Sequence, residues 1–190
     1  MRSAALILAG GQATRFGGAD KAFVQLKGKP FLDHVVARLR GQVDEIALSA
    51  NGDQTRFAAY GMQVLADDQA FKDCGPLAGV AAGLHWAATR GVEFLLTTPV
   101  DTPFFPHDLL AQLQPGPAFA VQNERAQPLC ALWPVAFLPA LEAFLHEPGR
   151  HKVSEALARC AARAVMFSAP SEAFANLNSP EDLARYENLP

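Results

Sequence analysis

The sequence predicts an α/β fold in which a mostly parallel, Rossmann-like sheet has helices on both faces, a three-layer α-β-α sandwich. The first observation is an alternation of short apolar runs, typical of buried strands, with segments that carry apolar residues at helical spacing. The second is length, because 190 residues fit one fairly large domain, residues 1–190, better than two. Half of the residues are hydrophobic, which is enough to build a core.

The first half of the chain alternates regularly between the two patterns. Residues 3–9 (SAALILA) predict a buried strand that ends at glycines, and residues 30–40 predict a helix with proline in its first turn. Further strands are predicted over residues 44–51, 62–67 and 92–101, and further helices over residues 53–61 and 75–89. Ligands of such sheets lie at the carboxyl ends of the strands, so the loops after the first and fourth strands are expected to share one crevice.

The second half is less regular, but its last element is well marked. Helices are predicted over residues 105–113 and 137–147, and strands over residues 117–122 and 127–134. Near the end, Ser179 is expected to cap a helix whose first residue is Pro180, with Glu181 and Asp182 in its first turn.

Composition and charge exclude several classes of protein. The formal net charge of −3 argues against general nucleic-acid binding, which usually shows an excess of lysine and arginine. No apolar run approaches a membrane-spanning length, and the short N-terminal run leads into glycines, unlike a signal peptide. The cysteines are odd in number and far apart, which predicts reduced thiols and a cytoplasmic location: Cys74, Cys130 and Cys160.

The stretch LILAGGQATRFGGADK, residues 6–21, places glycines and charges directly after the first predicted strand. It matches neither the P-loop nor the G-x-G-x-x-G dinucleotide fingerprint, which weakens a nicotinamide-dehydrogenase hypothesis. Glycines nevertheless let a backbone approach a ligand and direct several N–H groups at it, and Arg15 and Lys21 add cations suited to phosphate oxygens. The glycine pattern alone is equally compatible with a plain turn between a strand and solvated charges.

Within this stretch, LAGGQATRFGGADK (residues 8–21) resembles the signature loop of the molybdenum cofactor guanylyltransferase family, commonly L-A-G-G-x-S-x-R-M-G-x-D-K. Three further stretches match in order, so that the resemblance covers nearly the whole chain: GPLAGVAAGL, TTPVDTPFFPHDL and NLNSPEDLARY. Thr14 and Phe16 depart from the commonest letters of the loop. Related cytidylyltransferases more often have A-A-G and P-K where this chain has Ala9-Gly10-Gly11 and Asp20-Lys21.

The resemblance implies a Mg²⁺-dependent enzyme that transfers GMP from GTP to the terminal phosphate of molybdopterin and releases pyrophosphate. It implies catalytic roles for Arg15, Lys21 and Asp101, with Asp101 also binding the metal. The residues it assigns to GTP are Leu8, Ala9, Gly10, Gly11, Lys21, Ser49, Asn51, Asp67 and Asp101, with backbone N–H groups of residues 8–11 holding the nucleotide. It assigns four residues to binding of the acceptor substrate: Gly18, Gly75, Asn176 and Asn178. Molybdoenzymes or chaperones would take up the product. Neither nucleic acid nor a membrane is an expected partner.

Each assignment has a simpler structural alternative. Asp101 follows a buried strand, where a carboxylate can hold Mg²⁺ that bridges phosphates, but aspartate is also common in turns flanked by prolines. Ordinary turn chemistry equally accounts for the polar residues that follow the second and third strands and for the asparagines before the last helix. Gly75 precedes a helix rich in small residues, for which close packing is the main expected role.

Three alternative functions stay open at this stage. Two are sister reactions, a CTP-dependent transfer to molybdopterin and a nucleotidyl transfer to a sugar phosphate. The third is a nucleotide-binding module without turnover. Any of these transfers needs little covalent catalysis by the enzyme, because a phosphate monoester is largely dianionic at neutral pH and attacks without a strong base.

Overall fold

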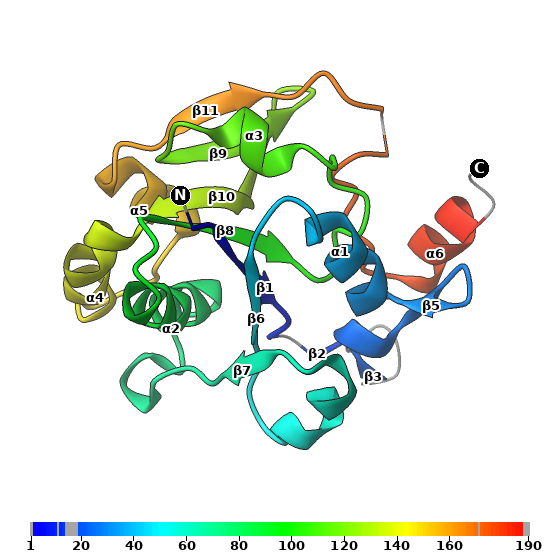
Figure 1. The fold of residues 1–190 in the computed structure, drawn as a ribbon, viewed down its shortest axis with the longest axis horizontal. Coiled ribbons are helices and arrows are strands. Elements are labelled where there is room, and N and C mark those ends of the chain that lie inside the picture. The colour runs from blue at the N-terminus through cyan, green and yellow to red at the C-terminus, as the bar shows by residue number, and fades with distance from the viewer. Residues whose placement is uncertain (1, 11, 14–18, 171, 188–190) are drawn as a thin grey trace.

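A computed structural model describes residues 2–10, 12–13, 19–170 and 172–187. Its centre is a seven-stranded sheet with the strand order β11-β9-β10-β8-β1-β6-β7 (Figure 1). The strands are β1 (Ala4–Leu8), β6 (Glu45–Ser49), β7 (Gln63–Leu65), β8 (Phe94–Pro99), β9 (Ala118–Gln122), β10 (Arg125–Pro134) and β11 (Arg163–Met166). β10 runs antiparallel to both of its neighbours, and the other pairings are parallel, as the sequence predicts for a mostly parallel sheet.

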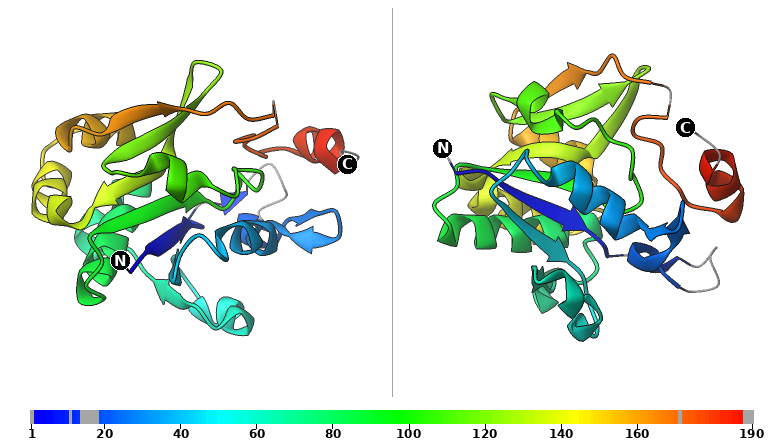
Figure 2. Two further views of the ribbon diagram at one scale, coloured as in Figure 1. Left: turned by 45° about the horizontal axis from the view of Figure 1, so that its top comes forward. Right: turned by 45° about the vertical axis from the view of Figure 1, so that its right-hand side comes forward.

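Helices cover both faces of this sheet, which confirms the three-layer sandwich (Figures 1 and 2). They are α1 (Phe31–Leu39), α2 (Pro76–Thr89), α3 (Leu109–Leu113), α4 (Leu138–Leu145), α5 (Val153–Arg159) and α6 (Pro180–Glu187). The alternation along β1 divides the core, because Ala5 and Ile7 pack with α1 and α3, while Leu6 and Leu8 pack with α2, α4 and α5. No helix within the described ranges is long and apolar enough to span a bilayer.

The structure departs from the sequence-based expectation at several short elements. Residues 53–61 do not form an α-helix but a 3₁₀ segment, η3 (Gln54–Tyr60), which Asp53 caps and a left-handed Gly61 ends. The strand β11 was not expected from the sequence. The other short elements are β2 (Gln12–Ala13) with β3 (Ala19–Asp20), β4 (Gln25–Leu26) with β5 (Lys29–Pro30), and the 3₁₀ turns η2 (Lys21–Phe23), η4 (Gln69–Phe71) and η5 (Val135–Phe137).

The predicted start of the last helix is confirmed. The Ser179 hydroxyl accepts a hydrogen bond from the Asp182 backbone N–H at 3.2 Å, and the Asp182 carboxylate accepts in return from the backbone N–H groups of Asn178 and Ser179, each at 2.9 Å. This reciprocal arrangement satisfies backbone donors that the helix leaves free. It holds Asn178 at a defined place beside the sheet edge.

Two glycines of α2 allow the helix to lie directly on the sheet. A Cβ at Gly83 would stand 2.5 Å from Leu6 Cδ2 and 2.9 Å from Leu95 Cδ2, and one at Gly79 would clash with the Ser49 hydroxyl. The small face predicted for this helix therefore packs on β1, β6 and β8 and brings the start of α2 to the carboxyl edge of the sheet.

Gly83→Ala is expected to destabilise the protein by about 1–3 kcal/mol, because the new methyl group overpacks the layer between α2 and β1. The sign of this change in the free energy of unfolding is informative, since glycine-to-alanine changes in helices otherwise stabilise a protein by up to about 1 kcal/mol. Urea unfolding measures the difference, with Ala82→Gly at a half-buried position of the same helix reporting the propensity effect alone. A gain in stability for Gly83→Ala would contradict the close packing.

Candidate active site

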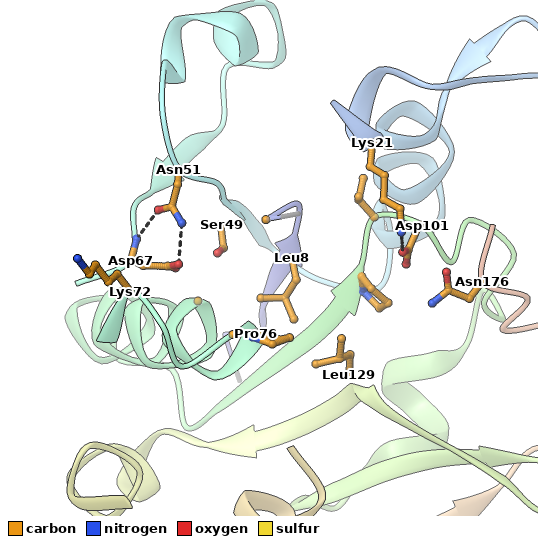
Figure 3. A pocket seen from close by; sticks show the side chains of 15 residues that line it. Leu8, Lys21, Ser49, Asn51, Asp67, Lys72, Pro76, Asp101, Leu129 and Asn176 are labelled. Carbon is orange, nitrogen blue, oxygen red and sulfur yellow. Dashed lines mark hydrogen bonds and ion pairs between the residues drawn. The ribbon is translucent and has the colours of Figure 1, made fainter. Parts of the chain in front are cut away.

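The carboxyl ends of β1, β6, β7 and β8 surround a cavity of about 460 Å³ (Figure 3). The loops after β1 and β8 thus meet in one crevice, as the strand pattern predicts. The lining residues are Leu8, Gly10, Lys21, Ser49, Asn51, Asp67, Lys72, Gly75, Pro76, Gly79, Pro99, Val100, Asp101, Leu129 and Asn176.

At one end of the cavity, Lys21 joins two segments that are distant in the sequence. Its Nζ donates to Asp101 Oδ2 and to Asn178 Oδ1, and the side chains of Lys21 and Asp101 are only 18% and 13% exposed. The Asp101 carbonyl accepts from the Leu177 backbone N–H at 2.8 Å, which fixes the residues before α6 against the loop after β8. A cation and an anion are therefore held at the edge of the sheet by three separate segments.

The second carboxylate oxygen of Asp101, Oδ1, is buried and accepts no hydrogen bond from the described residues. A buried carboxylate oxygen without a partner is costly, so its position suits an additional cation or donor. The described residues contain no group of three or more metal-ligating side chains, so a protein-only metal cage is not formed there. Mg²⁺ bound together with a nucleotide needs only one or two carboxylates, the remaining ligands being phosphate and water oxygens, and Asp101 fits that donor set.

At the other end of the cavity, Asn51 and Asp67 form a mutual pair. The Asn51 Nδ2 donates to Asp67 Oδ2 at 2.7 Å, and the Asp67 backbone N–H donates to Asn51 Oδ1 at 2.9 Å. These two hydrogen bonds lock the loop after β6 to the loop after β7 (Figure 3). The pair presents polar groups to the cavity beside the nearly buried Ser49.

Most of the residues assigned from the sequence lie at this cavity. Leu8, Gly10, Lys21, Ser49, Asn51, Asp67, Gly75, Asp101 and Asn176 line it, and Asn178 contacts Lys21. Gly11, Arg15 and Gly18 lie outside the described residues. The backbone N–H of Ala9 donates to the Ser49 carbonyl at 2.9 Å, which joins the end of β1 to the end of β6.

Sequence reasoning missed several residues of the cavity. Lys72 follows η4 and adds a cation near the Asn51–Asp67 pair, while Leu129 comes from β10 on the far side of β8. Neither Lys72 nor Leu129 belongs to a sequence motif. Only the strand order of the folded sheet brings these two residues to the cavity. Arg56 was also missed, and it pairs with Asp20, the acid of the glycine-rich stretch for which the sequence suggested no role.

Cys130 lies close to Asp101 but has no nucleophilic role. Burial, and to a smaller extent the negative charge of Asp101, raise the pKa of the Cys130 thiol. The thiol therefore stays protonated, and the thiolate is the nucleophilic form of cysteine. The charged residues that line the cavity are Lys21, Lys72, Asp67 and Asp101.

An α/β sheet with a glycine-rich first loop, and with a lysine and an aspartate at its carboxyl edge, is typical of proteins that bind nucleotides at that edge. The comparison with known proteins narrows this class. Residues 5–164 match the MobA-like NTP transferase domain, and the chain belongs to that family. The protein is therefore a nucleotidyltransferase, as the resemblance of the glycine-rich loop predicts.

Named relatives agree with this assignment, and solved structures share the fold. The chain is 50% identical to a molybdenum cofactor guanylyltransferase of Acidiphilium cryptum, over 94% of this chain and 91% of the relative. It is 48% identical to one of Cereibacter sphaeroides, over 100% and 97%. The fold is shared with molybdopterin-guanine dinucleotide biosynthesis protein A of Archaeoglobus fulgidus (TM-score 0.76, 22% identity, 97% and 96% covered) and with a 4-diphosphocytidyl-2C-methyl-D-erythritol synthase (TM-score 0.70, 16% identity, 98% and 97% covered).

Proposed function

We propose that the protein transfers GMP from Mg²⁺-bound GTP to the terminal phosphate of molybdopterin, releasing pyrophosphate and forming the guanine dinucleotide of the cofactor. The observation that carries this function is the placement of the Lys21–Asp101 pair and the Asn51–Asp67 pair at opposite ends of one cavity. The two ends suit the two parts of a nucleotide, its phosphates and its nucleoside. The activity in the names of the relatives, guanylyl transfer to the molybdenum cofactor, supports GTP and the cofactor as the substrates.

At the nucleoside end, the carboxylate of Asp67 supports a preference for guanine. The N1–H and N2–H₂ groups of guanine are adjacent donors that a carboxylate can accept, whereas cytosine and adenine each present an acceptor at the corresponding ring nitrogen. A base that leaves polar groups of the site unpaired is rejected strongly. Asn51 holds Asp67 in place for this contact, and Ser49 and Lys72 complete the polar wall.

At the phosphate end, the transfer is a substitution at the α-phosphorus. An oxygen of the acceptor phosphate forms the new P–O bond as the bond between the α-phosphorus and the bridging oxygen to the β-phosphorus breaks, and pyrophosphate leaves. The acceptor phosphate has its second pKa near 6 and is already dianionic at neutral pH, so no general base is required. Lys21 offsets the charge on the phosphates, and Gly10 lets them approach the backbone. Mg²⁺ held by Asp101 would orient the triphosphate and further reduce its charge.

The remaining assignments belong to the same proposal. Arg15 and Gly11 would extend the phosphate contacts of Lys21 and Gly10, and Leu8 and Ala9 would form the floor below them. Gly18, Gly75, Asn176 and Asn178 would face the acceptor, whose product then passes to molybdoenzymes or their chaperones. The described cysteines are free thiols, in keeping with the cytoplasmic location that we propose.

Thermal melting with GTP, CTP, ATP or UTP in the presence of Mg²⁺ tests the nucleotide. GTP at a hundred times its Kd is expected to stabilise the protein by about 2.7 kcal/mol, a rise in Tm of roughly 5–10 °C, with smaller shifts for the other three. Pyrophosphate release from GTP that requires molybdopterin tests turnover. A larger shift with CTP would overturn the choice of guanine, and a shift without pyrophosphate release would indicate a binding module.

A further inference from the structure

Arg56, a residue of η3, makes three hydrogen bonds that connect both ends of the cavity. Its Nε donates to Asp20 Oδ2 at 2.7 Å, its Nη2 donates to the Asn51 carbonyl at 2.8 Å, and its Nη1 donates to the Asp53 carbonyl. The side chains of Arg56 and Asp20 are 28% and 24% exposed, so their ion pair is partly shielded from water. The planar guanidinium is suited to this role, because its fixed fork can hold several acceptors at once.

Asp20 transmits this contact to the phosphate end. Its Oδ1 accepts from the backbone N–H of Ala22 at 3.0 Å, which caps η2, and Lys21 is the first residue of that turn. A stack of Phe23 of η2 on Phe57 of η3, with ring centroids 5.3 Å apart, holds the same two segments together. The backbone that carries Lys21 is therefore fixed against η3 by an ion pair and by a ring contact.

Asn51 transmits the contact to the nucleoside end. Its carbonyl accepts from Arg56, while its side chain exchanges the two hydrogen bonds with Asp67. A continuous series of contacts thus runs from Asp67 through Asn51 and Arg56 to Asp20 and the turn of Lys21. We call this series the Arg56 brace.

We propose that Arg56 is a positioning residue that couples the nucleoside end of the cavity to its phosphate end. This inference rests on the proposed function, because it assumes that one nucleotide occupies both ends. With the brace intact, Lys21 and the Asn51–Asp67 pair keep a fixed separation. Without it, each end binds its part of the nucleotide less well, because the two loops no longer hold each other in place.

Binding of two partial ligands, measured by titration calorimetry, tests the coupling. Guanosine probes the nucleoside end, and inorganic triphosphate with Mg²⁺ probes the phosphate end. Arg56→Met is expected to weaken both by roughly 3- to 30-fold, the range of a coupled charged contact. Asp20→Asn is the decisive variant. It is expected to weaken the binding of guanosine as well as that of triphosphate, although Asp20 is connected to the nucleoside end only through Arg56. The double variant is expected to lose little more than either single variant.

Two further variants control the experiment. Arg90 also pairs with a carboxylate, Glu45, at 3.0 Å and lies over an aromatic ring, that of Trp86, but at the amino end of β6. Arg90→Met is therefore expected to change the affinity for either ligand by no more than about twofold. Arg56→Lys keeps a charge beside Asp20 and loses the fork to Asn51, so the coupling is lost and both ligands are expected to stay weakened, whereas mere local support of Lys21 would restore triphosphate binding.

The inference is overturned if Asp20→Asn weakens triphosphate binding but leaves guanosine binding at the wild-type affinity. It is also overturned if Arg56→Met changes the two affinities as little as Arg90→Met does. A purely structural role would lower the Tm of the Arg56 variants while leaving both affinities at the wild-type value. Failure of wild-type protein to bind guanosine would instead contradict the base site of the proposed function. In that event the triphosphate measurement alone decides the role of Arg56. Arg56→Met must then still weaken triphosphate binding by more than Arg90→Met does.

Discussion

Asp101→Asn is expected to lower Mg²⁺-dependent GMP transfer by about 10²–10³-fold, the loss typical of removing one group that stabilises charge in the transition state. The amide keeps an oxygen that can accept from Lys21, but it removes the negative charge and places an NH₂ group near the metal position. The unpartnered Oδ1 of Asp101 is the atom that a cation would satisfy, and asparagine binds Mg²⁺ far less well than a carboxylate does. Transfer rates measured against Mg²⁺ concentration separate a loss of metal affinity from a loss of maximal rate.

Asp108→Asn is the matched control for this substitution. Asp108 lies beyond the same β8 loop and is exposed, and its carboxylate accepts only from the Gln112 side chain, at 2.8 Å, among the hydrogen bonds described. Its substitution is expected to leave the transfer rate within about twofold of the wild-type rate, since surface changes away from special features have small effects. Equal activity of the Asp101 and Asp108 variants would remove Asp101 from the metal site. An unchanged Tm for Asp101→Asn confirms that the fold is retained.

The fold was predictable where the chain alternates strongly between buried strands and amphipathic helices. β1, α1, β6, α2 and β8 follow the predicted order because short apolar strands alternate with longer helical segments, and a glycine or proline marks a boundary of each of them except β6. β11 was not, since Arg163–Met166 is a short edge strand whose residues are exposed or half-buried and therefore lack a hydrophobic pattern. The η3 segment satisfies helix start and stop signals alike, and only its 3₁₀ geometry differs from the expectation.

The site was predictable only to the level of the shared crevice. That prediction follows from parallel strands alone, because their carboxyl ends meet at one edge of the sheet. The partners across the crevice were not predictable in the same way. Lys21 and Asn178 are 157 residues apart, and Asp20 and Arg56 are 36 apart, with no spacing rule connecting them. Asp20 therefore looked unexplained in the sequence, although in the structure it is the residue that fixes the turn of Lys21.

Lys21→Ala is expected to lower GMP transfer by about 10²–10³-fold, because the charge that develops on the reacting phosphates loses its nearest described cation. A second effect has the opposite sign. In the nucleotide-free protein, Lys21 pairs with Asp101 Oδ2 and so competes with any other cation for that carboxylate. Removing Lys21 is therefore expected to raise the affinity of the nucleotide-free protein for Mg²⁺, even though turnover falls.

This pair of opposite effects separates a direct role of Lys21 from a disturbance of the fold. Misfolding would weaken Mg²⁺ binding and transfer together, whereas loss of the lysine alone strengthens the first and weakens the second. Lys29→Ala serves as the control, since Lys29 is an exposed lysine of the nearby β5 strand and is expected to change neither quantity. A near-wild-type transfer rate for Lys21→Ala would exclude the lysine from charge stabilisation. A transfer rate that falls together with Mg²⁺ affinity at an unchanged Tm would show that the Lys21–Asp101 contact supports the metal site instead of competing with it.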